Sequence, residues 1–116
     1  MNELRANLAE LVEALGKRTH MKRAPTGARS TKLSKCGFVP RLGGILVEMP
    51  GCSTFVSLIA GHLEKEIELN VKDLIPLHKV LLTFGTAEQY VDLSISAEKT
   101  TFSCGNFSLA VPSQSV

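Results

Sequence analysis

Apolar side chains near the start of the chain recur with the period of an α-helix. Over residues 4–15 they fall on a single helical stripe, at Leu4, Leu8, Leu11, Val12 and Leu15. Asn2 can cap the start of this helix, and Gly16 can end it in the left-handed conformation. The pattern therefore predicts a helix over residues 4–15, with no strand before it.

Patterns that are typical of β-strands follow in two groups. Residues 44–49 and 52–60 are predicted to form a hairpin around a Pro-Gly turn, and part of residues 33–39 is open to a further strand. In the second group, apolar and polar residues alternate as in strands with one solvated face, over residues 66–69, 90–95, 100–104 and 107–111. The tail after Pro112 is polar and is expected to fray.

A second amphipathic helix is predicted over residues 74–84. Its apolar stripe consists of Leu74, Leu77, Leu81 and Phe84. Its outer stripe consists of Lys72, Pro76, Lys79 and Thr83. If Asp73 caps the helix, Pro76 lies in the first turn, whereas a cap at Asn70 places it past that turn and predicts a kink. We favour the start at Asp73.

These elements form two similar blocks, each with a helix and antiparallel strands. The first half-repeat spans residues 2–60 and includes the segment 17–41, and the second spans residues 64–112. Each half has one apolar face and needs the other half to cover it. We therefore predict a single domain over residues 1–116, of the α+β class, in which two pseudo-repeated halves pack two helices on a sheet.

The composition is that of a folded protein with reduced cysteines. The chain has 116 residues, of which 44% are hydrophobic, and its three cysteines show no Cys-x-x-Cys pair. No apolar run approaches the ~20 residues of a membrane span, and the start is an acidic amphipathic pattern rather than a signal peptide. A cytoplasmic protein without membrane contact is expected.

A basic segment without acidic residues separates the two groups of elements. Between Ala14 and Val47 there is no Asp or Glu, yet this stretch holds eight of the thirteen basic residues, namely Lys17, Arg18, Lys22, Arg23, Arg29, Lys32, Lys35 and Arg41. The rest of the chain is therefore net acidic, although the whole chain has a net charge of +2. A basic arm on an acidic body is the composition expected of a contact with nucleic acid. The alternative is a solvated loop that only keeps the protein soluble.

Side chains that could carry chemistry are few and scattered. The three histidines show no metal-ligand spacing, so no metal site is predicted. Cys36 lies among basic residues and is open to a lowered pKa, but no partner base is visible. Glutamates occupy every second position at Glu64, Glu66 and Glu68. Such carboxylates can act in acid–base chemistry, but we favour the interpretation that their charges protect an edge strand from aggregation. Phosphate loops and nucleophile motifs are missing from the sequence, so neither an enzyme nor a cofactor is predicted.

Three runs in the second half resemble a domain of the DNA sliding clamps, the processivity factors of polymerases. The runs are EIELNVKDLIPLHKVL at residues 66–81, EQYVDLSI at residues 88–95 and TTFSCGNFSLAVP at residues 100–112. Residues 2–60 follow the same order of elements more loosely. The resemblance implies a clamp-like domain whose two helices lie side by side and direct basic side chains at DNA phosphates. A chain with one such domain needs to self-assemble to close a ring.

The sequence thus predicts a non-enzymatic protein that binds DNA, as an accessory factor in DNA metabolism. The expected contacts are phosphate contacts without sequence preference, from the eight basic residues of the segment and secondarily from Lys72 and Lys79. The alternative is a module for protein–protein interaction or homo-oligomerisation, with a clamp-like fold and no role on DNA.

Overall fold

The structure is a computed structural model that describes residues 2–17, 35–49, 51–84 and 89–116. In chain order its elements are β1 (Asn2–Asn7), α1 (Leu8–Gly16), β2 (Lys35–Arg41), β3 (Gly44–Met49), β4 (Cys52–Ala60), β5 (Ile67–Asn70), α2 (Val71–Thr83), β6 (Tyr90–Ile95), β7 (Lys99–Cys104) and β8 (Phe107–Ser115). Neither of these helices is long and apolar enough to cross a membrane.

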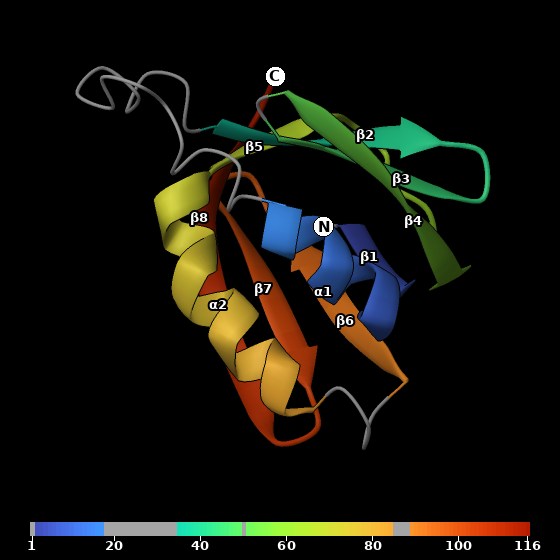
Figure 1. The fold of residues 1–116 in the computed structure, drawn as a ribbon. Helices are drawn as coiled ribbons and strands as arrows, with labels where there is room; N and C mark the ends of the chain where they lie inside the picture. The colour runs from blue at the N-terminus through green and yellow to red at the C-terminus, as the bar shows by residue number, and fades with distance from the viewer. Residues whose placement is uncertain (1, 18–34, 50, 85–88) are drawn as a thin grey trace, which may run out of the picture.

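The eight strands close into an antiparallel barrel (Figure 1). Around the barrel the order is β1-β4-β3-β2-β5-β8-β7-β6, and β6 pairs in turn with β1. Alternate residues of each strand point to the interior, so that Cys36 and Phe38 of β2 are buried while Gly37 and Val39 face outward.

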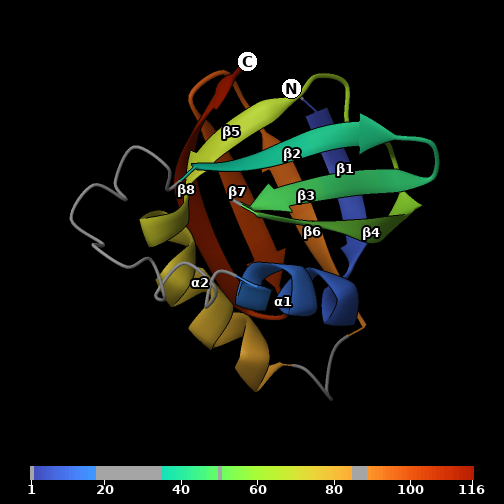
Figure 2. The same cartoon turned by 45° about the horizontal axis from the view of Figure 1, so that its top comes forward.

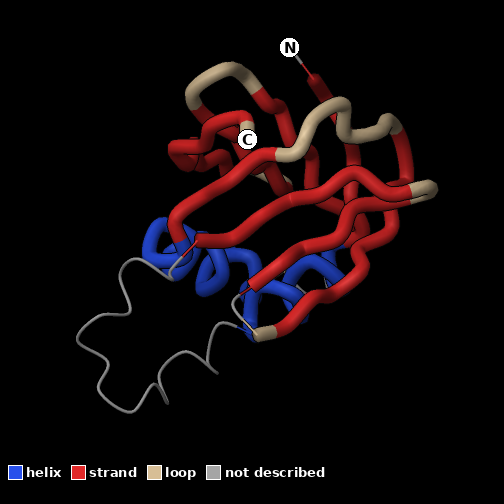
Figure 3. The backbone as a smooth tube through the Cα atoms, turned by 90° about the horizontal axis from the view of Figure 1, so that it is seen from above, coloured by secondary structure: helices blue, strands red, loops and turns tan. Residues whose placement is uncertain are grey.

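One apolar core fills the barrel and extends under the helices. Within this core Phe38 and Phe102 pack edge to face, with their ring centroids 6.3 Å apart. The two helices lie side by side on the same side of the barrel (Figures 2 and 3). Their buried faces carry leucines at helical spacing, namely Leu8, Leu11, Leu15, Leu74, Leu77 and Leu81.

The predicted fold class is wrong. A clamp-like α+β domain with two helices packed on a sheet is expected from the sequence, but the strands close into one barrel and hold more than half of the described residues. Closure depends on pairings between strands far apart in the chain, such as β1 with β6 and β2 with β5. No local hydrophobic period reveals such pairings.

The predicted first helix begins too early, because its first residues form β1. Leu4 and Ala6 are buried in the barrel as alternate residues of this strand. Leu4 also lies four residues before Leu8, so it fits the helical period equally well. The helix starts after Asn7, whose side-chain Oδ1 accepts a hydrogen bond of 3.0 Å from the backbone N–H of Glu10.

The start of the second helix also differs from the favoured prediction. Asn70 is its N-cap residue and Pro76 lies inside the helix, as in the alternative that we did not favour. The strand predictions over residues 44–49, 52–60 and 90–95 are confirmed. The predicted fraying after Pro112 is wrong, because residues 113–115 pair with β5.

Candidate nucleic-acid interface

Four of the ten predicted phosphate contacts lie around helix α2. These are Lys17, Lys35, Lys72 and Lys79. Arg41 is also described but lies elsewhere. The remaining five lie outside the described residues, namely Arg18, Lys22, Arg23, Arg29 and Lys32.

Lys17 lies where α1 ends against α2. Its backbone N–H closes the helix by donating to the carbonyl oxygens of Ala14 and Leu15. The preceding Gly16 approaches α2 so closely that a Cβ there would lie 3.3 Å from Nε2 of His78. The first described stretch of the chain, residues 2–17, therefore ends beside the middle of α2.

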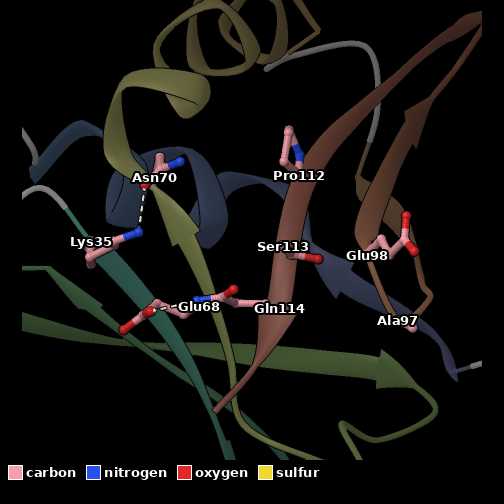
Figure 4. A pocket seen from close by; sticks show the side chains of 8 residues that line it. All are labelled: Lys35, Glu68, Asn70, Ala97, Glu98, Pro112, Ser113 and Gln114. Atoms are coloured by element: carbon pink, nitrogen blue, oxygen red, sulfur yellow. Dashed lines mark hydrogen bonds between the residues drawn. The ribbon is translucent and has the colours of Figure 1, made fainter.

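Lys35 lies at the other end of that segment, beside the first turn of α2. It is the first residue of β2 and pairs with Asn70, the N-cap residue of the helix. Its Nζ donates a hydrogen bond of 2.9 Å to Oδ1 of Asn70 (Figure 4). The amide nitrogen of Asn70 donates in turn to Oδ2 of Asp73, at 3.4 Å. The carbonyl oxygen of the Asn70 side chain thus holds a lysine rather than capping the helix backbone.

Lys72 and Lys79 are both exposed on α2. They are seven residues apart, which is close to two full turns, so they lie on one face of the helix. Exposed ammonium groups at this spacing can neutralise phosphates without reading bases. Glu10, which the sequence places on an outer helical stripe, is held against β4, because its Oε1 accepts a hydrogen bond of 2.7 Å from the Ser57 backbone N–H.

Arg41 is not part of this group. It ends β2, about 20 Å along the strand from Lys35 at ~3.3 Å per residue. Its Nη1 donates a hydrogen bond of 2.8 Å to the carbonyl oxygen of Pro40. Arg41 thus lies apart from the four lysines around α2, and its predicted phosphate contact stays a prediction.

A polar hollow lies beside Lys35 (Figure 4). It has a volume of about 440 Å³ and is lined by Lys35, Glu68, Asn70, Ala97, Glu98, Pro112, Ser113 and Gln114. The hydroxyl of Ser113, one of these residues, shares a buried hydrogen bond of 2.9 Å with the hydroxyl of Thr100. Because the hollow contains two glutamates, its charge is mixed and does not match an anion.

Cys36 is buried and does not have the reactive thiol that the sequence left open. Burial, with a smaller contribution from the charge of Glu48, raises its pKa to about 12. A thiol with this pKa is protonated at neutral pH, so the alternative of a reactive Cys36 is wrong. Within the described part of the chain, no group of three His, Cys, Asp or Glu residues could hold a metal ion.

The edge-strand interpretation of the acidic run is wrong as well. β5 pairs with β2 on one side and β8 on the other, so it is an interior strand of the barrel. Of the three glutamates only Glu68 lies in this strand, and its Oε1 accepts a hydrogen bond of 3.4 Å from Gln114. The acidic run needs another explanation.

Arg5 was missed by sequence reasoning because β1 was assigned to a helix. Its Nε lies 2.8 Å from Oδ1 of Asp92, and its guanidinium lies 3.9 Å from the centre of the Tyr90 ring. The hydrogen bond with Asp92 raises the pKa of Arg5. The charge of Arg5 therefore joins β1 to β6.

Comparison with known proteins assigns no family to the chain. No protein-family model matches it, and no curated protein is significantly similar to it. The resemblance to sliding clamps stays a prediction, because an eight-strand antiparallel barrel neither establishes nor excludes it.

Proposed function

We propose that this protein is a non-enzymatic DNA-binding protein that contacts the phosphate backbone, as an accessory factor in DNA metabolism. The observation that carries the proposal is the position of the two lysines that flank residues 18–34. Lys17 and Lys35 both lie beside α2, which itself exposes Lys72 and Lys79. By sequence alone, residues 18–34 contain five further basic residues.

Binding of this kind is driven by the release of counterions from DNA. Each phosphate contact adds ~0.9 to the slope of log affinity against log salt. With roughly six to eight contacts, the affinity falls by orders of magnitude between low and moderate salt, whatever the base sequence.

A salt titration tests this function. The anisotropy of a fluorescein-labelled duplex is measured with the wild type and with a Lys72→Gln/Lys79→Gln variant. We expect the variant to bind more weakly and its salt slope to be smaller by about 2, whereas Lys65→Gln, in the exposed loop between β4 and β5, changes neither. A wild type that shows no salt-dependent DNA affinity contradicts the proposal.

A second candidate function is homo-oligomerisation or protein–protein interaction through a strand edge. Residues 52–56 of β4 pair only with β3, and β1 joins β4 only at Leu58 and Ala60. Residues 107–112 of β8 likewise pair only with β7. Open backbone groups of this kind can accept a further strand from a second copy or another protein.

Light scattering separates the second candidate from the first. An oligomer is expected to dissociate when Ser53→Pro removes one N–H from the open side of β4, with DNA affinity at α2 retained. A monomeric wild type over the micromolar range contradicts oligomerisation through this edge.

We also propose a cytoplasmic location. The support for it is chemical, because none of Cys36, Cys52 and Cys104 forms a disulfide. Unpaired cysteines are usual in reducing compartments.

A further inference from the structure

The outer face of strands β2, β3 and β4 carries an apolar row. Val39 pairs with Leu46, and Leu46 pairs with Phe55, so that the three side chains lie next to one another across three strands. Phe55 is 46% exposed and the other two are half-buried. Side chains on the solvated face of an antiparallel sheet are usually polar, so a row of three large apolar ones needs a reason.

An acidic row runs beside the apolar one. Glu68 pairs with Gly37, and Gly37 pairs with Glu48, so one glutamate lies on each side of a residue without a side chain. A Cβ on Gly37 would lie 3.6 Å from Oε1 of Glu48 and 4.0 Å from Oε2 of Glu66. The carboxylates of Glu48 and Glu66 therefore converge over the gap at Gly37.

No cation neutralises these carboxylates among the described residues. The ion pair found there joins Arg5 to Asp92, on strands β1 and β6. The two basic side chains on the same face, Lys35 and Arg41, lie at its opposite ends and hydrogen-bond to Asn70 and Pro40 instead. Converging like charges raise the free energy of the protein unless a positive charge meets them.

We propose that this face docks an extended segment of a partner protein in which a Lys or Arg and a large apolar residue lie two residues apart, on the same face of the segment. The basic group enters above Gly37, between the carboxylates of Glu48 and Glu66. The apolar side chain packs against Leu46 and Phe55 in the neighbouring row. Charge complementarity selects the basic residue, and burial of the exposed ring of Phe55 supplies the apolar contribution.

The spacing of the two rows constrains the segment. Gly37 and Val39 are two residues apart on one strand, or about 7 Å. The partner therefore presents its basic and apolar groups about 7 Å apart, as alternate residues of an extended segment do. None of these docking residues belongs to α2, so the proposal goes beyond DNA binding.

A peptide titration tests the proposal. The probe is a fluorescein-labelled synthetic peptide with the repeat Lys-Ser-Leu-Ser, which puts lysine and leucine two residues apart on one face, and the control peptide has glutamates in place of the lysines. We expect the lysine peptide to bind the wild type, and its affinity to fall at least tenfold in Glu48→Lys and in Phe55→Ser. Glu13→Lys makes the same charge change on the exposed face of α1 and is expected to leave binding unchanged.

Two further measurements make the result decisive. If Glu48→Lys unfolds the protein by circular dichroism, Glu66→Gln replaces it, with the same expected direction. The methyl signals of Val39 and Leu46 are expected to shift on titration in NMR spectra. Equal affinity of wild type and variants for the lysine peptide, or equal binding of both peptides, overturns the proposal. The affinity for duplex DNA is measured on the same variants and is expected to be unchanged. A failure of the peptide-docking proposal can therefore be distinguished from a failure of the DNA-binding proposal.

Discussion

The two halves of the chain contain the same elements in the same order, but they pair equivalent backbone N–H groups differently. Each half runs strand, helix and three strands, over residues 2–60 and 67–115. Two backbone hydrogen bonds mark equivalent positions, from Leu58 N–H to the Gly43 carbonyl at 3.1 Å and from Ser113 N–H to the Glu98 carbonyl at 2.9 Å. N–H groups alternate in direction along a strand, so the N–H position of the residue before each donor points away from the hairpin.

That preceding residue is Ser57 in the first half and Pro112 in the second. The N–H of Ser57 donates to the carboxylate of Glu10 on α1. Pro112 has no N–H, so the same position needs no acceptor. The first half thus gives the N–H an acceptor, whereas the second half has no N–H at this position. In both halves, no N–H is left unpaired where the strand changes its pairing partner.

The two helix starts differ in a similar way. Asn7 caps α1 with its side chain, whereas the side chain of Asn70 binds Lys35 and Asp73. The second half thus gives up a helix cap and holds a lysine of the proposed DNA contact. The comparison teaches that equivalent asparagines stabilise the fold in one half and position a charged side chain in the other.

The largest expected effect tests whether the halves share one core. Phe38 pairs with Val47 in the first half, and Phe102 pairs with Leu93 in the second, so the aromatic ring occupies opposite members of the equivalent pairs. Phe38→Ala and Phe102→Ala should each lower the free energy of unfolding by about 3–5 kcal/mol in urea titrations. Because the rings touch edge to face, we expect non-additivity of about 1 kcal/mol in the double variant. Strict additivity would show that the two halves are independent.

The next largest effect tests the difference between Ser57 and Pro112. Glu10→Ala leaves the N–H of Ser57 without its acceptor, and should cost about 1–2 kcal/mol of unfolding free energy. Glu10→Gln keeps an acceptor oxygen and should cost less. Asp73→Ala, at the equivalent position of α2, is the matched control and should cost less than Glu10→Ala.

A double variant sharpens this test. Ser57→Pro removes the donor, as Pro112 does in the other half, so it should cost less in the Glu10→Ala background than in the wild type. Equal costs in both backgrounds would mean that the hydrogen bond from Ser57 to Glu10 does not contribute to stability.

The helix caps provide a smaller difference. Asn7→Ala should cost about 1 kcal/mol of unfolding free energy, because it removes the acceptor for the N–H of Glu10. Asn70→Ala should cost less than half as much, since its side chain caps no backbone N–H. Chemical denaturation of both variants measures the difference, and the opposite ranking would refute the comparison of the two caps.

Local patterns predicted the elements that neighbouring residues determine. The hairpin over residues 44–60 and the strand over residues 90–95 were found because a period of two residues and tight turns are local signals. The strand β1 was missed because Leu4 fits both a helical and a strand period. Its pairing with Leu93 of β6, almost ninety residues away, decides between the two.

The candidate sites show the same limit. The shared face of Lys72 and Lys79 follows from helical spacing, and the sequence predicts it correctly. The position of Lys35 beside α2, and of Glu48 beside Gly37, follows from strand pairing and has no local signal. Sequence reasoning found which residues are charged, whereas the register of the barrel determines which of them meet.

The last comparison concerns the cysteines, which differ in burial. Cys36 is fully buried in β2 of the first half, and its pKa is raised from an ordinary value of 9.0 to about 12. The folded protein therefore keeps the thiol protonated while the unfolded chain ionises it. The free energy of unfolding should fall as the pH rises from about 9 toward 12, and should not change through this thiol below pH 9.

Replacement of the buried thiol isolates its contribution. The fall in unfolding free energy between pH 8 and pH 10.5 should be smaller in Cys36→Ala than in the wild type, and Cys52→Ala, at a half-buried position of β4, is the control. Iodoacetamide should label Cys52 before Cys36, because only an exposed thiolate reacts. Rapid labelling of Cys36 in the folded protein would mean that β2 opens readily, and would place the weaker part of the barrel in the first half.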